Sequence, residues 1–94
     1  MNGPRLARVT VTIVNKRGLH ARASAKFVET AARFQSDVMV TKGDATVSGR
    51  SIMGLMMLAA PLGSSIELSA QGPDAAEAVE ALLALVAAKF HEDA

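Results

Sequence analysis

Four short segments of this 94-residue chain alternate between apolar and polar residues, and this pattern limits the possible folds. In the first segment, Val9, Val11 and Ile13 fall on one face and polar side chains on the other. A period of two is typical of a strand that is buried on one face only. The four segments are residues 8–14, 37–42, 45–48 and 64–70. Strands of this kind predict a mostly antiparallel sheet with one face in solvent and the other covered.

Three helices are predicted between or after these strands. Helical spacing of apolar residues indicates the first and the last. An apolar run bounded by Gly49 in front and Pro61 behind indicates the middle one. The predicted helices are residues 21–35, 51–60 and 74–90. The middle helix is short and contains Gly54, which weakens a helix interior. Asp74 is placed to cap the last helix, with Glu77 three residues later as in a capping box. Val79, Leu82, Leu83, Val86 and Phe90 form the predicted buried stripe of that helix.

The order of elements is β-α-β-β-α-β-α, which predicts the α+β class. We expect an open-faced two-layer β-sandwich, in which a four-stranded, mostly antiparallel sheet carries three helices on one face. Neither an internal repeat nor a low-complexity linker divides the chain. Residues 1–94 should therefore form a single domain with its core at about residues 8–90, and residues 91–94 should be a frayed tail.

Composition excludes several classes of function. Ten basic and nine acidic residues leave a net charge of +1, so the charge favours neither nucleic acid nor a membrane surface as a partner. The chain has no cysteine, which rules out disulfides and thiolate chemistry. It has no apolar run of the length that a signal peptide or a membrane span requires, so we expect a cytoplasmic protein without membrane insertion. No metal-ligand cluster surrounds His91, and no nucleotide fingerprint occurs, so neither metal nor cofactor is expected.

His20 is the residue most suited to chemistry, because it lies where the first turn meets the first helix. The start of a helix presents unpaired N–H groups and the positive end of the helix dipole, which favour an anion. Arg22 could add a two-pronged hydrogen-bonding group to the same anion. A neutral imidazole is also a nucleophile at physiological pH. From these residues alone, a solvated cap or a packed polar residue is the commoner role of such a histidine.

Two runs, residues 15–22 (NKRGLHAR) and 51–58 (SIMGLMML), resemble the signature segments of the histidine-containing phosphocarrier family HPr. The resemblance covers about residues 8–90. It implies that His20 accepts a phosphoryl group from enzyme I of the phosphoenolpyruvate-dependent phosphotransferase system and passes it to an enzyme IIA domain. Arg22 would stabilise the phosphate. The family implies a carrier that acts only with partner enzymes and is not itself an enzyme, and we expect a monomer.

The same resemblance implies a docking face made by the middle helix and the start of the first helix. Its expected contacts are Ala25, Ile52, Met53 and Met56. The residues themselves leave open that the methionines are all core. Ser51 is well placed as an N-cap, and in the family this position carries a regulatory phosphoserine made by a matching HPr serine kinase/phosphorylase. A regulatory binding module controlled by Ser51 is the alternative function.

Two positions depart from the family's usual pattern. Ala23 stands where members usually carry Pro, which should loosen the start of the helix but removes no donor to a phosphate. Glu29 stands where the family often has a basic residue, which bears on the choice of partner. The sequence leaves the sugar-transport and nitrogen-regulatory branches of the system both open.

Overall fold

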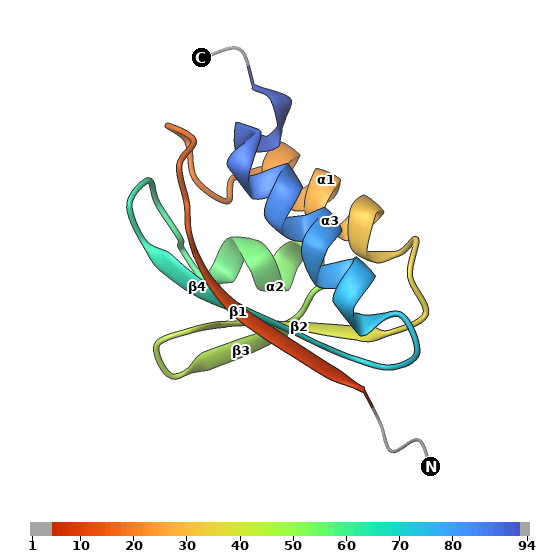
Figure 1. The fold of residues 1–94 in the computed structure, drawn as a ribbon. Coiled ribbons are helices and arrows are strands. Elements are labelled where there is room, and N and C mark those ends of the chain that lie inside the picture. Colours follow the sequence, from red (N-terminus) through yellow and green to blue (C-terminus); the bar gives the residue numbers. More distant parts are fainter. Residues whose placement is uncertain (1–4, 93–94) are drawn as a thin grey trace.

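The computed structural model describes residues 5–92, and in it a four-stranded antiparallel sheet carries helices on one face (Figure 1). The strand order is β1-β4-β2-β3, and every neighbouring pair is antiparallel. The elements are β1 (Leu6–Thr12), α1 (Ala21–Ala31), β2 (Asp37–Lys42), β3 (Ala45–Ser48), α2 (Ile52–Met57), β4 (Ser65–Gln71), α3 (Ala75–Ala87) and a short 3₁₀ turn, η1 (Lys89–His91). The predicted α+β open-faced sandwich is thereby confirmed. Residues 1–4 and 93–94 of the expected domain lie outside the described residues.

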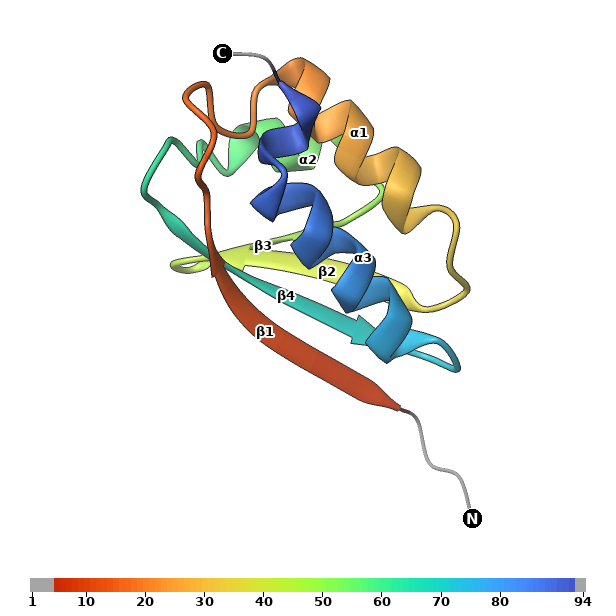
Figure 2. The ribbon, with the colours of Figure 1, turned by 45° about the horizontal axis from the view of Figure 1, so that its top comes forward.

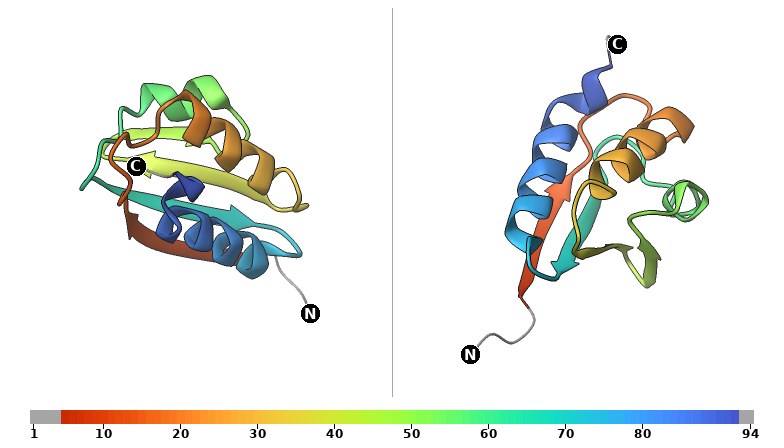
Figure 3. Two further views of the ribbon diagram at one scale, coloured as in Figure 1. Left: turned by 90° about the horizontal axis from the view of Figure 1, so that it is seen from above. Right: turned by 90° about the vertical axis from the view of Figure 1, so that its right-hand side faces the viewer.

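The helices form one layer, and the opposite face of the sheet is open (Figure 2). Seen from above, α3 lies over β1 and β4, α1 lies beside α3, and α2 lies beyond α1 on the side of β3 (Figure 3). The predicted alternation holds in β4, where Ile66, Leu68 and Ala70 are buried between neighbours that are more exposed. The core joins these residues to Phe27 of α1, Leu82 of α3 and Leu55 of α2.

The predicted hairpin between residues 37 and 48 is closed by a two-residue loop. Lys42 pairs with Ala45, so Gly43 and Asp44 make the turn. Gly43 has a φ of 59° and is the first of these two loop residues, which fits the II′ turn preferred in hairpins. This glycine therefore sets the register of the β2–β3 pair.

Several predicted boundaries differ from the structure, among them those of the last strand, which spans residues 65–71 instead of 64–70. The first strand spans residues 6–12 instead of 8–14, and the middle helix spans 52–57 instead of 51–60. The first helix ends at Ala31, not near Gln35. The N–H groups of Arg33 and Phe34 donate three residues back, to the carbonyls of Thr30 and Ala31, so the chain tightens into turns there.

The predicted capping box of the last helix is wrong. Asp74 precedes α3, but its side chain does not cap that helix. Its carboxylate instead accepts hydrogen bonds from the backbone N–H groups of Gln35 and Ser36 at 2.9 Å each, and from the Ser36 hydroxyl at 2.6 Å. The carboxylate thus connects the start of α3 to the loop after α1. These hydrogen bonds hold the pKa of Asp74 below its usual range, and the bond from Ser36 has the largest effect.

The chain after α3 also departs from the prediction. Phe90 is fully buried as expected, but it lies outside the regular helix, in η1. Lys89, Phe90 and His91 have φ values of 57°, 55° and 59°, in the left-handed region. Each such non-glycine residue costs about 1–2 kcal/mol. Burial of Phe90 and a hydrogen bond from Lys26 Nζ to the Phe90 carbonyl at 2.6 Å offset that cost. Residues 91 and 92 are therefore held in place, and the expected fraying is wrong for them.

Candidate functional site

The loop before α1 is fixed by a close approach of two backbones. Gly18 has a φ of 64°, and a Cβ atom built on it would lie 2.3 Å from the carbonyl oxygen of Ala60. Only glycine fits this position without displacing the loop before β4. The next residue, Leu19, donates its N–H to that same carbonyl at 3.0 Å and buries its side chain. These contacts determine where His20 enters the helix.

His20 is the N-cap residue of α1, with an extended backbone (φ −74°, ψ −179°). Its carbonyl accepts the first helical hydrogen bond, from Ser24 N–H at 2.8 Å, but its side chain does not cap the helix. The Ser24 hydroxyl points back to the carbonyl of Leu19 at 3.2 Å. The N–H groups of the first turn of α1 thus have no side-chain cap, which is the predicted setting for an anion beside His20.

His20 lines an open hollow between the loop before α1 and the loop after α2. Arg17, Leu19, Ala59, Ala60 and Pro61 complete its lining. Arg17 thus adds a basic residue to the lining of the hollow. Arg22, the arginine predicted to hold a phosphate, is exposed on the first turn of α1 and makes no ion pair within residues 5–92. Its guanidinium is therefore available to an incoming anion.

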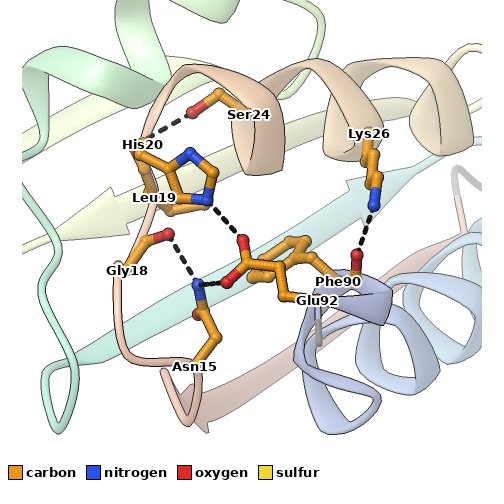
Figure 4. Close-up of polar contacts among 8 residues, drawn as sticks. All are labelled: Asn15, Gly18, Leu19, His20, Ser24, Lys26, Phe90 and Glu92. Atoms are coloured by element: carbon orange, nitrogen blue, oxygen red, sulfur yellow. Dashed lines mark hydrogen bonds and ion pairs between the residues drawn. The ribbon is translucent and has the colours of Figure 1, made fainter. Parts of the chain in front are cut away.

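A carboxylate from the C-terminal segment contacts His20 (Figure 4). Glu92 Oε2 is hydrogen-bonded to His20 Nε2, and Glu92 Oε1 accepts a hydrogen bond from Asn15 Nδ2 at 3.2 Å. The His20 and Glu92 side chains are only 15% and 11% exposed, so solvent screens this pair weakly. Burial raises the pKa of the Glu92 carboxyl, but hydrogen bonds from His20 and Asn15 and the nearby charge of Arg17 together hold it below its usual range.

Asn15 is the buried anchor of this arrangement. It has no exposed surface, and its Nδ2 also donates to the carbonyl of Gly18 at 2.9 Å. One amide group thus joins the turn that carries His20 to the carboxylate that contacts the His20 ring. Its Oδ1 is the one buried side-chain polar atom within residues 5–92 that lacks a hydrogen-bond partner.

The surface of α2 is apolar, as the sequence suggested. Leu55 is its single buried residue, while Ile52, Met53, Met56 and Met57 are exposed by 40%, 69%, 41% and 79%. The interpretation that all of these methionines are core is wrong. Ser51 caps α2, since its Oγ accepts from Gly54 N–H at 2.9 Å. A Cβ on Gly54 would lie 3.0 Å from Ser51 Oγ and from Val47 Cβ, so a glycine lets α2 approach β3. Ala25 is exposed on α1.

Sequence reasoning missed three residues at this site. Arg17 had a local signal, since it is a basic residue three positions before His20. Asn15 stood in the predicted turn, but nothing in the sequence indicates that it is buried. No feature of the sequence indicated a role for Glu92, because it lies 72 residues from His20, in a segment whose sequence resembled a tail. In the described part of the chain, no group of three potential metal ligands occurs, and no helix has the length and hydropathy to cross a membrane.

Comparison with known proteins places this geometry in a family. Residues 7–88 match the family model described as the PTS HPr component phosphorylation site. The phosphocarrier protein HPr of Neisseria meningitidis is 54% identical over 87 residues, which cover 93% of this chain and 98% of that protein. The phosphocarrier protein NPr of Shewanella violacea is 44% identical and covers 87% of this chain and 90% of its own.

Solved structures agree with this assignment. The crystal structure of HPr-C-His from Thermoanaerobacter tengcongensis matches with a TM-score of 0.89 and 45% identity, covering 94% of this chain and 99% of that one. A structure described as an HPr dimer from the same organism matches with a TM-score of 0.74 and 48% identity, covering 89% of this chain and 97% of that one. With a family match along most of its length, close relatives of nearly equal length and the same fold, the chain belongs to the HPr family of phosphocarriers of the phosphotransferase system.

Proposed function

We propose that His20 is the residue that carries the phosphoryl group, taking it from enzyme I and passing it to an enzyme IIA domain. The observation that carries this proposal is the position of His20, one residue before α1 and at the edge of an open hollow. A phosphoryl group on the ring would lie near the uncapped N–H groups of the first turn of α1. Arg22 is exposed on that turn, and Arg17 lines the hollow.

The transfer requires little of the protein beyond positioning and charge. The lone pair of a ring nitrogen attacks the phosphorus of the donor, and the bond from phosphorus to the donor group breaks, with its electron pair returning to that group. The reverse steps deliver the phosphoryl group to the acceptor. A helix terminus stabilises a charge by only about 0.3–1 kcal/mol, or about 2 when partly buried, so the product stays transferable. This modest stabilisation suits a carrier.

Intact-mass measurement after incubation with phosphoenolpyruvate and enzyme I tests the assignment. The parent protein should gain one acid-labile phosphate, and His20→Ala should gain none. His91→Ala is the matched control, since His91 is the other histidine of the chain and is exposed, and it should behave as the parent. A phosphate gain by His20→Ala would overturn the proposal.

The branch of the system is a second question that the same assay answers. The curated relatives carry the names HPr and NPr, and the residues leave both branches possible. Incubation with enzyme I from the sugar branch and, separately, from the nitrogen-regulatory branch should give phosphorylation from one donor far faster than from the other. Sedimentation of the carrier alone and with enzyme I tests whether it works as the monomer that we expect.

In this proposal α2 forms most of the surface on which partners dock, and its N-cap is the site of regulation. The exposed side chains of Ile52, Met53 and Met56, together with Ala25, would form the surface that enzyme I and enzyme IIA contact, since methionine-rich surfaces adapt to more than one partner. Ser51 would be the site of a serine kinase. Its hydroxyl stands at the edge of that surface and already faces the N–H of Gly54.

A further inference from the structure

Two methionine side chains of α2 lie in solvent beside each other. Met53 and Met57 are 69% and 79% exposed, more than any other large apolar residue within residues 5–92. They are four positions apart in the helix, so they share one face and are neighbours on it. Met56, in the same helix, is 41% exposed. Three of the five methionines of the chain are thus concentrated in α2.

The position of α2 explains this exposure. Figure 3 shows α2 at the edge of the helix layer, with α1 as its helical neighbour. Leu55 is the one residue that α2 buries, and neither Met53 nor Met57 belongs to the core. A chemical change at their sulfur atoms should therefore leave the packing of the domain intact.

We propose that Met53 and Met57 are sites of reversible oxidation by hydrogen peroxide, which weakens the docking of enzyme I; this rests on the proposed use of α2 as the docking surface. A sulfur lone pair attacks one oxygen of the peroxide, and an S–O bond forms as the O–O bond breaks. The proton of the transferred oxygen passes to the departing oxygen, which leaves as water. Sulfur loses two electrons, and the peroxide gains them.

The sulfoxide can be returned to the thioether. Methionine sulfoxide reductases, one for each epimer, catalyse this step. A dithiol supplies the two electrons and is oxidised to a disulfide, and the oxygen of the sulfoxide leaves as water. Oxidation of methionine therefore works as a switch, unlike the irreversible steps of the cysteine series.

Oxidation places a polar group on the surface where a partner would dock. The sulfoxide oxygen accepts hydrogen bonds from water, and an apolar partner surface would remove that water without offering a donor. Ile52 and Met56, exposed by 40% and 41%, make the surroundings of the new group apolar. Neither Met53 nor Met57 lines the hollow at His20. Oxidation should therefore change the affinity of the docked complex and leave the chemistry of transfer as it is.

Peptide mapping by mass spectrometry after brief treatment with hydrogen peroxide tests the assignment of the sites. Met53 and Met57 should become sulfoxides several-fold faster than Met56 and Met39, which is 37% exposed. Methionine sulfoxide reductases with dithiothreitol should then remove the added oxygens. Oxidation of Met39 or Met56 ahead of the other two, or sulfoxides that the reductases leave in place, would overturn the proposal.

Transfer kinetics test the consequence. After removal of peroxide with catalase, phosphorylated enzyme I donates to the oxidised carrier. The Michaelis constant should rise about tenfold, the cost of desolvating one polar group, while the maximal rate stays the same. Reduction of the sulfoxides should return the constant to its starting value. The double variant Met53→Leu with Met57→Leu keeps apolar bulk without sulfur, and its constant should be the same before and after peroxide.

Met39→Leu is the matched control. Met39 alternates along β2 with buried Val38 and Val40, so it lies on the face of the sheet opposite the helices. After peroxide, this variant should show the same rise in the Michaelis constant as the parent. A smaller rise would mean that Met39 is responsible and would overturn the proposal.

The remaining outcomes separate this proposal from those beneath it. An unchanged Michaelis constant after oxidation of both methionines, or an equal rise in the double leucine variant, would overturn it. So would loss of helical circular dichroism, because the effect would then be unfolding. Failure of the carrier role would show separately, as phosphate uptake by His20→Ala. Failure of the docking surface would show without peroxide, as a parental Michaelis constant for Ser51→Asp.

Discussion

The backbone that carries His20 depends on Gly18, two residues earlier. Its φ of 64° lies in the left-handed region, and the space that a side chain would fill is taken by the backbone of Ala60 and Pro61. Backbone atoms cannot move aside as the end of a flexible side chain can. The conformation of this one residue therefore decides where the imidazole and the start of α1 lie.

Gly18→Ala should destabilise the protein by about 2–4 kcal/mol, combining about 1–2 for left-handed backbone with a further cost for the overlap with Ala60. Gly43→Ala is the control, because Gly43 also has a positive φ, 59°, but nothing lies within 4 Å of the added Cβ. The free energy of unfolding of that variant should fall by only about 1–2 kcal/mol. Denaturant unfolding of both measures the difference. Equal losses of stability in the two variants would mean that Gly18 does not approach the backbone of Ala60 closely.

Arg22→Lys should keep the fold but slow phosphoryl transfer several-fold, because a point charge replaces a planar fork that can hold two phosphate oxygens. Arg22 is exposed and makes no ion pair within residues 5–92, so the melting temperature should barely change. Single-turnover transfer from enzyme I measures the rate. Arg17→Lys, measured in parallel, shows whether the arginine in the hollow shares the role. A parental rate for Arg22→Lys would assign the phosphate to the backbone N–H groups and Arg17.

At the scale of elements, α2 is a helix that packs through little more than Leu55. It is short, it contains Gly54, and four of its large apolar side chains are exposed. The Ser51 cap and the close approach to β3 permitted by Gly54 compensate in part. A charge added at its N-terminus should therefore change what the surface binds more than whether the helix forms.

Ser51→Asp should raise the Michaelis constant for transfer from enzyme I to His20 while the melting temperature stays close to that of the parent. The carboxylate can still accept from the N–H of Gly54, so the helix keeps a cap. The charge lies beside the apolar side chains of Ile52 and Met53, where a docked partner would have to desolvate it. Ser65→Asp, at the exposed first residue of β4, is the control and should leave the constant unchanged. An unchanged constant for Ser51→Asp would place the docking surface elsewhere.

At the scale of the molecule, two carboxylates join segments that are far apart in the chain. Asp74 connects the start of α3 to the loop after α1, and Glu92 connects the C-terminal segment to the loop before α1. In both cases the native pKa lies below its usual range. The helix layer is therefore held together by ionised groups as well as by its apolar core.

These lowered pKa values predict acid sensitivity. The unfolded chain binds protons at the ordinary values of about 4, whereas the native carboxylates resist protonation. The stability contributed by Asp74 and Glu92 is therefore complete above that range and is lost as the pH falls through their native pKa values. Asp74→Ala should melt at a lower temperature than the parent at pH 7, and the difference should shrink in acid. Glu80→Ala, which removes an exposed carboxylate from the middle of α3, should match the parent at each pH. A difference independent of pH would show that the carboxylate charge is not responsible.

The sequence by itself determined the parts of this protein that depend on periodicity and on local chemistry. Alternation in residues 64–70 predicted which face of β4 is buried, and the positions of Gly18 and His20 predicted a turn and a helix start suited to an anion. The tertiary structure decided which donor each carboxylate meets. Asp74 had a local cap available but bonds to Gln35 and Ser36, and Glu92 reaches His20 across 72 residues. A hydrogen bond requires two atoms about 3 Å apart, and which distant groups come that close is decided by the packing of the whole chain, which no local pattern records.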